Sequence, residues 1–141
     1  MENFSIEECS NSDYMQLSRG ITNFNLQHLP ANADKHLMSL GYVARVKGKL
    51  VGGVVGKLLL GQNLSIDILW VIDEFRHKGV GSRLLSTLEE NAKRYGSSLA
   101  VVDTFDFQAL DFYKKQGYTV FGELKDSPYK GNVRYYLFKQ Y

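Results

Sequence analysis

The residues best suited to chemistry lie in one short segment, residues 76–81, which reads Arg-His-Lys-Gly-Val-Gly. Gly79 and Gly81 allow the backbone to turn tightly and to approach a ligand without a Cβ in the way. The helix expected after them presents free backbone N–H groups at its N-terminus, where the helix dipole also favours anions. Because Arg76 and Lys78 add positive charge around this point, the segment predicts a site for a diphosphate.

Two better-known glycine loops do not fit this segment. The dinucleotide-binding pattern needs a third glycine where Leu84 stands, and the nucleoside-triphosphate loop needs a Gly-Lys-Ser/Thr sequence that does not follow here. A plain glycine-rich turn that caps a helix is the structural alternative, and the segment alone does not decide between it and the diphosphate site.

The elements around this loop alternate between strand and helix patterns. Strands are expected over residues 42–46, 50–60, 64–72, 98–104, 118–124 and 133–138, and helices over residues 13–27, 79–95 and 107–116. Phe4, Ile6 and Glu8 fit one face of a further strand, whereas residues 28–40 form either a short helix or a loop. Strand–helix–strand order in the second half implies a parallel pair of strands with a right-handed crossover. The predicted fold class is therefore α+β, or α/β in three layers, with a mixed sheet and helices on both faces.

Length and composition limit the classes of protein that this chain can represent. Its 141 residues suit a single domain over residues 1–141, and a hydrophobic content of 44% argues against disorder. A net charge of only +2 and scattered basic residues argue against a nucleic-acid partner. Cys9 is the only cysteine, which excludes an intramolecular disulfide and a cysteine-based zinc site. No apolar run approaches the roughly 20 residues of a membrane span, so we expect a cytoplasmic protein without a membrane partner.

Two segments carry a resemblance to a known family. Residues 71–85, Val-Ile-Asp-Glu-Phe-Arg-His-Lys-Gly-Val-Gly-Ser-Arg-Leu-Leu, resemble motif A of the GNAT family of N-acetyltransferases, whose core is Arg/Gln-x-x-Gly-x-Gly/Ala. Residues 107–118, Phe-Gln-Ala-Leu-Asp-Phe-Tyr-Lys-Lys-Gln-Gly-Tyr, are similar to its motif B, in which Asn or Gln and Ala precede Phe-Tyr. The resemblance is specific over residues 64–122, whereas residues 1–40 match only in having a strand and helices. It implies a mostly antiparallel sheet in which one parallel pair of strands splays apart.

The same resemblance implies acetyl-CoA as the cosubstrate and assigns three groups of residues to it. The loop around the pyrophosphate would consist of Arg76, His77, Lys78, Gly79, Val80, Gly81 and Ser82, with the backbone amides of residues 78–82 as the direct contacts. The strand residues whose backbone would pair with the pantetheine amides are Leu69, Trp70 and Val71. Gln108 and Phe112 would border the cosubstrate, and Tyr113 would lie near its sulfur.

Acetyl transfer to an amine sets three chemical requirements. The amine must lose a proton, the tetrahedral oxyanion needs a donor, and the departing thiolate benefits from a proton. A backbone N–H near Leu69 or Trp70 could serve the oxyanion, and Tyr113 is the candidate proton donor, unless its ring only packs beneath the sheet.

Asp67 is the candidate base for the amine. Strand alternation places it on one face with Leu69 and Val71. A carboxylate in this apolar strand is costly to bury unless it is paired or faces a wet cleft, and burial would make it a better base. A carboxylate bound to a neighbouring strand or loop is the alternative, and some members of the family use water chains instead.

These observations favour one function and leave a second open. The first is transfer of an acetyl group from acetyl-CoA to a primary amine of a small molecule or peptide by direct attack in a ternary complex. The second is a catalytically weak acyl-CoA-binding regulatory module.

Asp103 and Asp106 could contact an acceptor amine, although Asp106 can also cap the next helix. His28, His36 and His77 lack metal-ligand spacing, so no metal is expected. Residues 14–40 and 125–131 are expected to shape the acceptor site, and a homodimer stays open.

Overall fold

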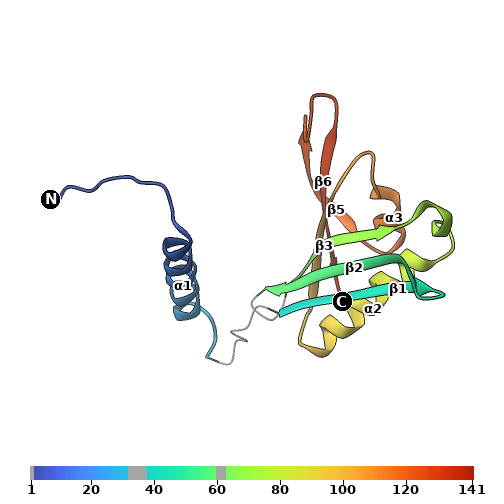
Figure 1. The fold of residues 1–141 in the computed structure, drawn as a ribbon, viewed down its shortest axis with the longest axis horizontal. Helices are drawn as coiled ribbons and strands as arrows, with labels where there is room; N and C mark the ends of the chain where they lie inside the picture. The colour runs from blue at the N-terminus through green and yellow to red at the C-terminus, as the bar shows by residue number, and fades with distance from the viewer. Residues whose placement is uncertain (1, 32–37, 60–62) are drawn as a thin grey trace. The chain divides into compact units, whose positions relative to one another are not determined.

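The computed structural model describes residues 2–31, 38–59 and 63–141, which fall into two compact units, Met1–Lys35 and His36–Tyr141 (Figure 1). The single domain expected from the chain length stays a prediction. Parts of the expected segments 28–40 and 50–60, together with His36, lie outside the described residues.

The first unit consists of one helix and the segment that precedes it. Helix α1 spans Asn11–Gln27 and begins after Ser10, whose hydroxyl accepts a hydrogen bond from the Asp13 N–H while the Asp13 carboxylate accepts one from the Ser10 N–H. This reciprocal cap explains why the helix begins two residues earlier than expected. The strand expected around Phe4 and Ile6 is wrong, because residues 2–10 have no regular structure and are exposed. No side chain of α1 is buried.

The second unit is built on one six-stranded sheet. Its strands are β1 (Met38–Val46), β2 (Lys49–Leu59), β3 (Asn63–Val71), β4 (Leu99–Phe105), β5 (Thr119–Lys125) and β6 (Val133–Gln140). Its helices are η1 (Asp73–Phe75), α2 (Val80–Arg94) and α3 (Leu110–Lys115). The strands lie in the order β1-β2-β3-β4-β6-β5, and each neighbouring pair is antiparallel except β3 and β4. The predicted fold class, a mixed and mostly antiparallel sheet with one parallel pair, is confirmed.

Helix α2 covers the sheet because its leucines recur at helical spacing. Leu84, Leu85 and Leu88 are buried against β1, β2 and β3, and each such side chain contributes about 1.5–3 kcal/mol when fully buried. The helix comes so close to β2 that a Cβ on Gly56 would lie 3.3 Å from Leu88 Cδ2 and 2.9 Å from the Ser65 carbonyl oxygen. Helix α3 contributes Tyr113 to the same core.

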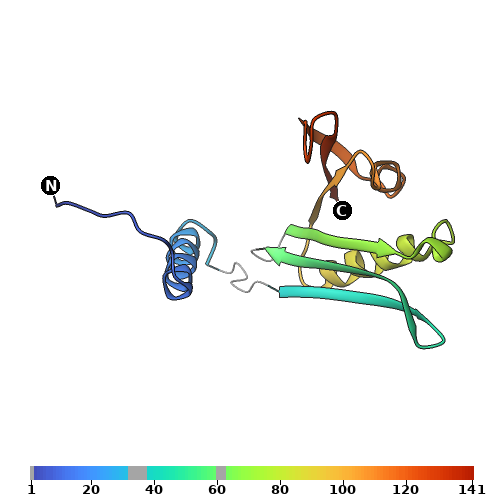
Figure 2. The ribbon, with the colours of Figure 1, turned by 45° about the horizontal axis from the view of Figure 1, so that its top comes forward.

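The parallel pair β3–β4 is held for only part of its length. Its register comprises three residue pairs, from Asn63 opposite Leu99 to Ser65 opposite Val101. Beyond them the strands diverge, and Figure 2 shows β4 leaving β3 as it rises toward α3. β3 remains paired with β2 on its other side as far as Val71. Among the described residues, no strand pairs with the edge of β3 that faces this gap after Ser65.

Candidate active site

The predicted diphosphate loop follows η1, which comes just after β3, and it leads into α2. His77 and Gly79 both have left-handed backbone conformations, with φ of 58° and 82°. Such residues turn successive N–H groups into a concave surface that suits anions. Gly79 is the N-cap of α2, and no side chain of the described residues caps the helix there. Because the first N–H groups of an α-helix lack intrahelical acceptors, those of Val80, Gly81 and Ser82 are available to a ligand.

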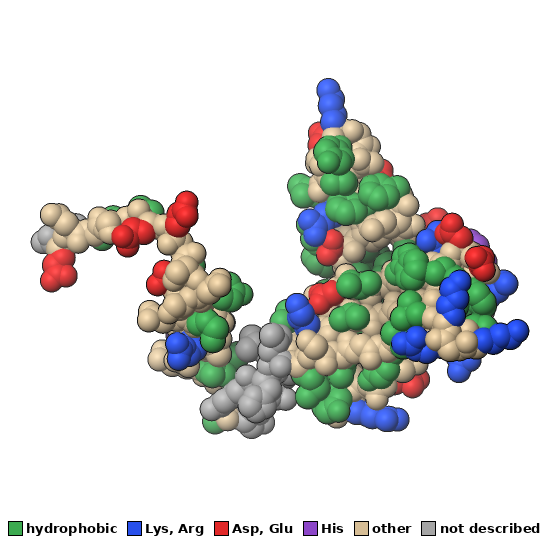
Figure 3. All heavy atoms as spheres, viewed as in Figure 1, with side chains coloured by type: hydrophobic (Ala, Val, Ile, Leu, Met, Phe, Trp, Pro, Cys, Tyr) green, Lys and Arg blue, Asp and Glu red, His purple; other side chains and the backbone are tan. Residues whose placement is uncertain are grey.

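Positive charge surrounds this loop, although Arg76 is already engaged. Its Nε–H donates to the Val71 carbonyl oxygen at 2.9 Å, and its guanidinium forms an ion pair with Asp73 at 2.8 Å. Lys78 extends over the Phe75 ring, with its Nζ 5.3 Å from the ring centroid. Figure 3 shows Lys and Arg side chains, a histidine and some acidic side chains at the end of the unit where β3 leads into η1. Arg76 therefore fixes the start of the loop, while Lys78 contributes an unpaired charge among the described residues.

Helix α3 is fastened to the same loop at two points. A Cβ on Gly81 would lie 3.5 Å from the Phe112 ring and 3.9 Å from Val71 Cγ2. Gly81 thus lies between the end of β3 and α3, at the mouth of the gap. Gln116 donates through its Nε2 to the Ser82 hydroxyl at 2.9 Å. The structure therefore brings Phe112 and Ser82, both predicted to contact the cosubstrate, to one place, and Gln116 is a residue that the sequence argument missed.

The Gln108 side chain stabilises the turn that precedes α3. Its side-chain oxygen accepts hydrogen bonds from the Phe105 N–H at 2.8 Å and from the Thr104 hydroxyl at 3.3 Å. The Thr104 oxygen in turn accepts from the Ala109 N–H. These bonds hold residues 104–109 in a turn, so α3 begins at Leu110 and not at residue 107. The residue is exposed, and its predicted place beside the cosubstrate stays a prediction.

Tyr113 combines a buried ring with an open hydroxyl. Burial raises its pKa to about 12, with a smaller contribution from the Asp103 carboxylate. Its ring packs edge-on against Phe112 and Tyr118, at centroid distances of 5.3 and 5.6 Å. Within the described part of the chain, its hydroxyl makes no hydrogen bond, and no buried polar side-chain atom lacks a partner. The hydroxyl oxygen is therefore not enclosed, and it is free to donate to a ligand.

The surroundings of Asp67 differ from those expected. Ile66 pairs with Gly56 and Ile68 with Val55, so Asp67 is the extra residue of a β-bulge. The bulge breaks the alternation predicted for this strand, because Ile66 faces the same core as Leu69 and Val71, while Ile68 and Trp70 are exposed.

Asp67 is consequently not buried. Its side chain is 33% exposed and forms an ion pair with Lys57, with 3.5 Å between Nζ and Oδ2. The expectation that burial would make this carboxylate a better base is therefore wrong. A bulge cannot be recognised from side-chain types alone, and neither Asp67 nor Lys57 signals it in the sequence.

Two other acidic residues near the gap are already paired. Asp103 on β4 accepts hydrogen bonds from Arg134, whose Nη2 and Nε atoms lie 2.6 and 2.8 Å from its Oδ2. Asp106 accepts from the Asn132 side chain at 3.3 Å. The capping role expected for Asp106 is wrong, because the N-cap of α3 is Ala109.

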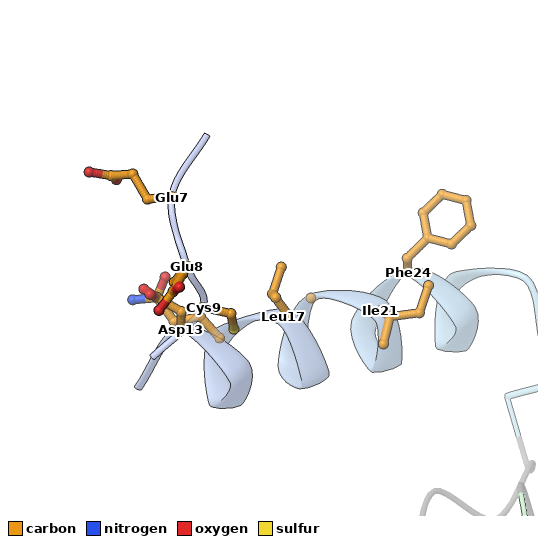
Figure 4. A pocket seen from close by; sticks show the side chains of 9 residues that line it. Glu7, Glu8, Cys9, Asp13, Leu17, Ile21 and Phe24 are labelled. Atoms are coloured by element: carbon orange, nitrogen blue, oxygen red, sulfur yellow. The ribbon is translucent and has the colours of Figure 1, made fainter. Parts of the chain in front are cut away.

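A groove within the first unit includes none of the predicted catalytic or cosubstrate-binding residues, although part of its lining comes from the range 14–40 expected to shape the acceptor site. Figure 4 shows it along α1 and the segment before it, where acidic side chains lie at one end and Leu17, Ile21 and Phe24 along the helix. In the part of the chain that the structure describes, no cluster of three or more His, Cys, Asp or Glu side chains could hold a metal ion. Nor is any helix of that part long and apolar enough to cross a membrane.

Comparisons with known proteins agree with this geometry. A model of the acetyltransferase (GNAT) family matches residues 7–118. Blasticidin-S acetyltransferase of Streptomyces morookaense is 39% identical over 88 residues, which are 62% of this chain and 64% of that protein. The match to a second curated relative, an acetyltransferase of Agrobacterium fabrum, spans 54% of that protein, so this chain spans less than two thirds of either relative.

Solved structures extend the likeness over the whole chain. An acetyltransferase from Bacillus cereus is 33% identical, with a TM-score of 0.89 and coverage of 98% of each chain. An aminoglycoside 6'-N-acetyltransferase complexed with coenzyme A has a TM-score of 0.65 at 16% identity, with 93% of this chain and 92% of that one covered. At that identity the second likeness concerns the fold alone. On the family match over most of its length, this chain belongs to the acetyltransferase (GNAT) family.

Proposed function

We propose that this chain transfers an acetyl group from acetyl-CoA to a primary amine of a small molecule or peptide, with both substrates bound together. The observation that carries the proposal is the edge of β3 that no described strand pairs with after Ser65, together with the uncapped N-terminus of α2, which follows β3 in the chain after η1 and the loop. A ligand with a diphosphate and an extended amide-containing arm matches that combination.

The loop would hold the diphosphate through backbone groups. The N–H groups of Val80, Gly81 and Ser82 lie at the positive end of the α2 dipole, which favours negative charge there. Lys78 adds a mobile ammonium beside them. Because most of these donors are main-chain atoms, affinity in this region depends on backbone conformation more than on side-chain identity.

The edge of β3 would hold the arm and assist the chemistry. Backbone groups of alternate residues between Ile66 and Val71 point into the gap, where an extended ligand can pair with them as an added strand. A backbone N–H among Leu69, Trp70 and Val71 would also donate to the negative charge that develops on a carbonyl oxygen held there. When bound, acetyl-CoA supplies a thioester whose C–S bond breaks as a C–N bond to the amine forms.

Tyr113 would provide the proton donor for the departing sulfur. With a pKa of about 12, its phenol keeps its proton at neutral pH and offers an O–H for a hydrogen bond. Its partner-free hydroxyl within the described chain supports this role. As the C–S bond breaks, the Tyr113 hydroxyl would give its proton to the thiolate and regain one from water, so that coenzyme A leaves as a thiol. The nitrogen of the new C–N bond would release the extra proton that it carried, which leaves a neutral amide.

Two groups could accept the proton that the amine nitrogen loses, Asp67 and water. Asp67 would receive it if the acceptor displaced Lys57 from the carboxylate, and an exposed ion pair is weak enough for such an exchange, at about 0.2–1 kcal/mol. Otherwise water would carry the proton away. The pairing of Asp67 with Lys57 also keeps the second function open, a catalytically weak acyl-CoA-binding module.

A thiol-release assay would separate the two functions. The panel of amines would contain blasticidin S, an aminoglycoside, a lysine-containing peptide and a polyamine. The first two are chosen because a relative and a fold neighbour are named as acetyltransferases of these compounds. The acetyltransferase predicts amine-dependent thiol release and an N-acetylated product by mass spectrometry. Tight binding of coenzyme A by calorimetry without release for any amine would favour the module.

A further inference from the structure

A carboxylate lies inside the core on the same helix that begins at the diphosphate loop. Glu89 is 4% exposed and stands on the apolar stripe of α2, between Leu85 and Ala92. An ionised carboxylate is costly to remove from water unless both oxygens find partners. Its presence on this stripe therefore requires an explanation beyond packing.

Two residues from the C-terminal half of the sheet satisfy Glu89. The Tyr118 hydroxyl donates to its Oε1 at 3.0 Å, and the Lys139 ammonium donates to its Oε2 at 2.8 Å. Lys139 Nζ also lies 5.6 Å from the centroid of the Tyr118 ring. The cluster of Glu89, Tyr118 and Lys139 thus joins α2, the residue before β5, and β6.

This cluster leads directly to Tyr113. The Tyr118 N–H donates to the Tyr113 carbonyl oxygen at 3.0 Å. The two rings meet edge-on, with 5.6 Å between centroids and 70° between planes. Since the Tyr113 hydroxyl has no hydrogen bond among the described residues, its direction is set by what its ring packs against. Tyr118 is one of those contacts, and Glu89 fixes Tyr118.

We propose that Glu89, Tyr118 and Lys139 form a positioning cluster that holds the Tyr113 hydroxyl in place for proton donation. The inference rests on the proposed function, because it concerns the same reaction. The cluster includes none of the residues proposed to contact either substrate. Its members act through the Tyr113 ring, so their effect should appear in kcat and not in cosubstrate binding.

A double-mutant cycle tests this role. Tyr118→Phe keeps the ring and removes the hydrogen bond to Glu89, and Tyr95→Phe is the matched control because Tyr95 is 50% exposed. We expect Tyr118→Phe to lower kcat about tenfold, in keeping with the sensitivity of reactions to small displacements, with KM for acetyl-CoA within about twofold of wild type. In a Tyr113→Phe background the same change should alter kcat less than about twofold, because the group being positioned is gone.

Three kinetic outcomes would overturn the inference. Equal losses in both backgrounds would show that Tyr118 acts without Tyr113, and wild-type kcat in Tyr118→Phe would show that the hydrogen bond does not matter. Wild-type kcat in Tyr113→Phe would remove the donor role on which the cluster depends, while acetyl transfer itself would stand.

A readout without turnover covers the case in which no amine is acetylated and the proposed function fails. In protein labelled with ¹³C at the tyrosine ε positions, the Tyr113 signal is assigned by its loss in Tyr113→Phe. Glu89→Gln leaves both rings in place, and we expect it to shift or broaden the Tyr113 signal more than Tyr95→Phe does. An unchanged signal in folded Glu89→Gln, or a change no larger than that in the control, would overturn the positioning role whatever the activity.

Discussion

The two ends of the gap between β3 and β4 depend on different parts of the polypeptide. At the loop end, the groups available to a ligand are backbone amides, and left-handed residues such as Gly79 set their direction. At the reacting end, the candidates are the side chains of Tyr113 and Asp67, whose surroundings come from distant segments. The loop is thus a local structure, whereas the reacting end is a product of tertiary packing.

This difference predicts which property a substitution should change at each end of the gap. A change in the loop alters a conformation that a few consecutive residues define, and it should act on binding of the cosubstrate. A change at the reacting end alters a side chain held by two or three elements, and it should act on the rate of transfer. Separate effects on binding and on rate therefore test the comparison.

The largest effect is expected for Tyr113→Phe. Loss of a proton donor typically lowers a rate by about 10²–10⁴-fold, and we expect kcat to fall about 100-fold with little change in KM for acetyl-CoA. The ring remains, so the melting temperature should stay close to that of the wild type. Steady-state thiol release measures the effect. If affinity for acetyl-CoA fell as much as kcat, the reacting end would not act separately from the loop end.

The next effect concerns stability at high pH. Burial raises the pKa of Tyr113 to about 12, while an unfolded tyrosine ionises near its ordinary pKa of about 10. The neutral phenol therefore stabilises the folded state fully below pH 10, and this contribution is lost as the pH rises toward 12. Its size is on the order of 2 kcal/mol.

Urea unfolding between pH 9 and 12 measures this contribution. Wild type should lose more stability over that range than Tyr113→Phe, whose ring cannot ionise. Identical pH dependence in the two proteins would mean that Tyr113 is not held in a buried, neutral form.

A smaller effect is expected for Gly79→Ala, and the chain offers a matched control. Gly79 and Gly48 have φ of 82° and 79°, and no heavy atom would lie within 4 Å of an added Cβ at either. Alanine at each position should cost about 1–2 kcal/mol of stability, because a Cβ is strained in the left-handed region. Only Gly79→Ala should weaken coenzyme A, by about tenfold, which corresponds to about 1.4 kcal/mol. Equal affinities in the two variants by calorimetry would remove the loop from the binding site.

The smallest effect is expected for Asp67→Asn. Because this carboxylate is partly exposed and paired with Lys57, we expect a fall in kcat of less than about tenfold and a stability change within about 1 kcal/mol. Lys57→Met, which leaves the carboxylate unpaired, is the companion variant. A fall in kcat as large as that of Tyr113→Phe would show instead that Asp67 is the indispensable base.

The sequence predicted what depends on neighbours in the chain. Gly79 and Gly81 before a leucine stripe indicated the loop and α2, and Ser98–Thr104 indicated a central strand that the structure places between β3 and β6. The bulge at Asp67 was not predictable, because it arises from the register between β2 and β3. The late start of α3 had a similar cause, since it depends on the bonds between Gln108 and Thr104.

One missed signal was present in the sequence. Glu89 stands four residues after Leu85 and three before Ala92, on the apolar face of the helix expected over residues 79–95. A carboxylate at such a position indicates a buried partner. Its partners, Tyr118 and Lys139, are 29 and 50 residues away, so only the fold could identify them.

The most direct test of the account is a calorimetric comparison of coenzyme A with pantetheine, which keeps the amide-containing arm and the thiol but lacks the diphosphate. Pantetheine also lacks the phosphorylated adenosine, so the loop's share is the part of the difference that Gly79→Ala removes. If the backbone amides at the start of α2 anchor the ligand, coenzyme A should bind at least about 100-fold more tightly than pantetheine, a difference of about 2.7 kcal/mol. About half of that free-energy difference should be lost in Gly79→Ala, in keeping with its tenfold effect on coenzyme A, and all of it should persist in Gly48→Ala. Equal affinity for the two ligands, or no binding of coenzyme A, would contradict a diphosphate site at this loop.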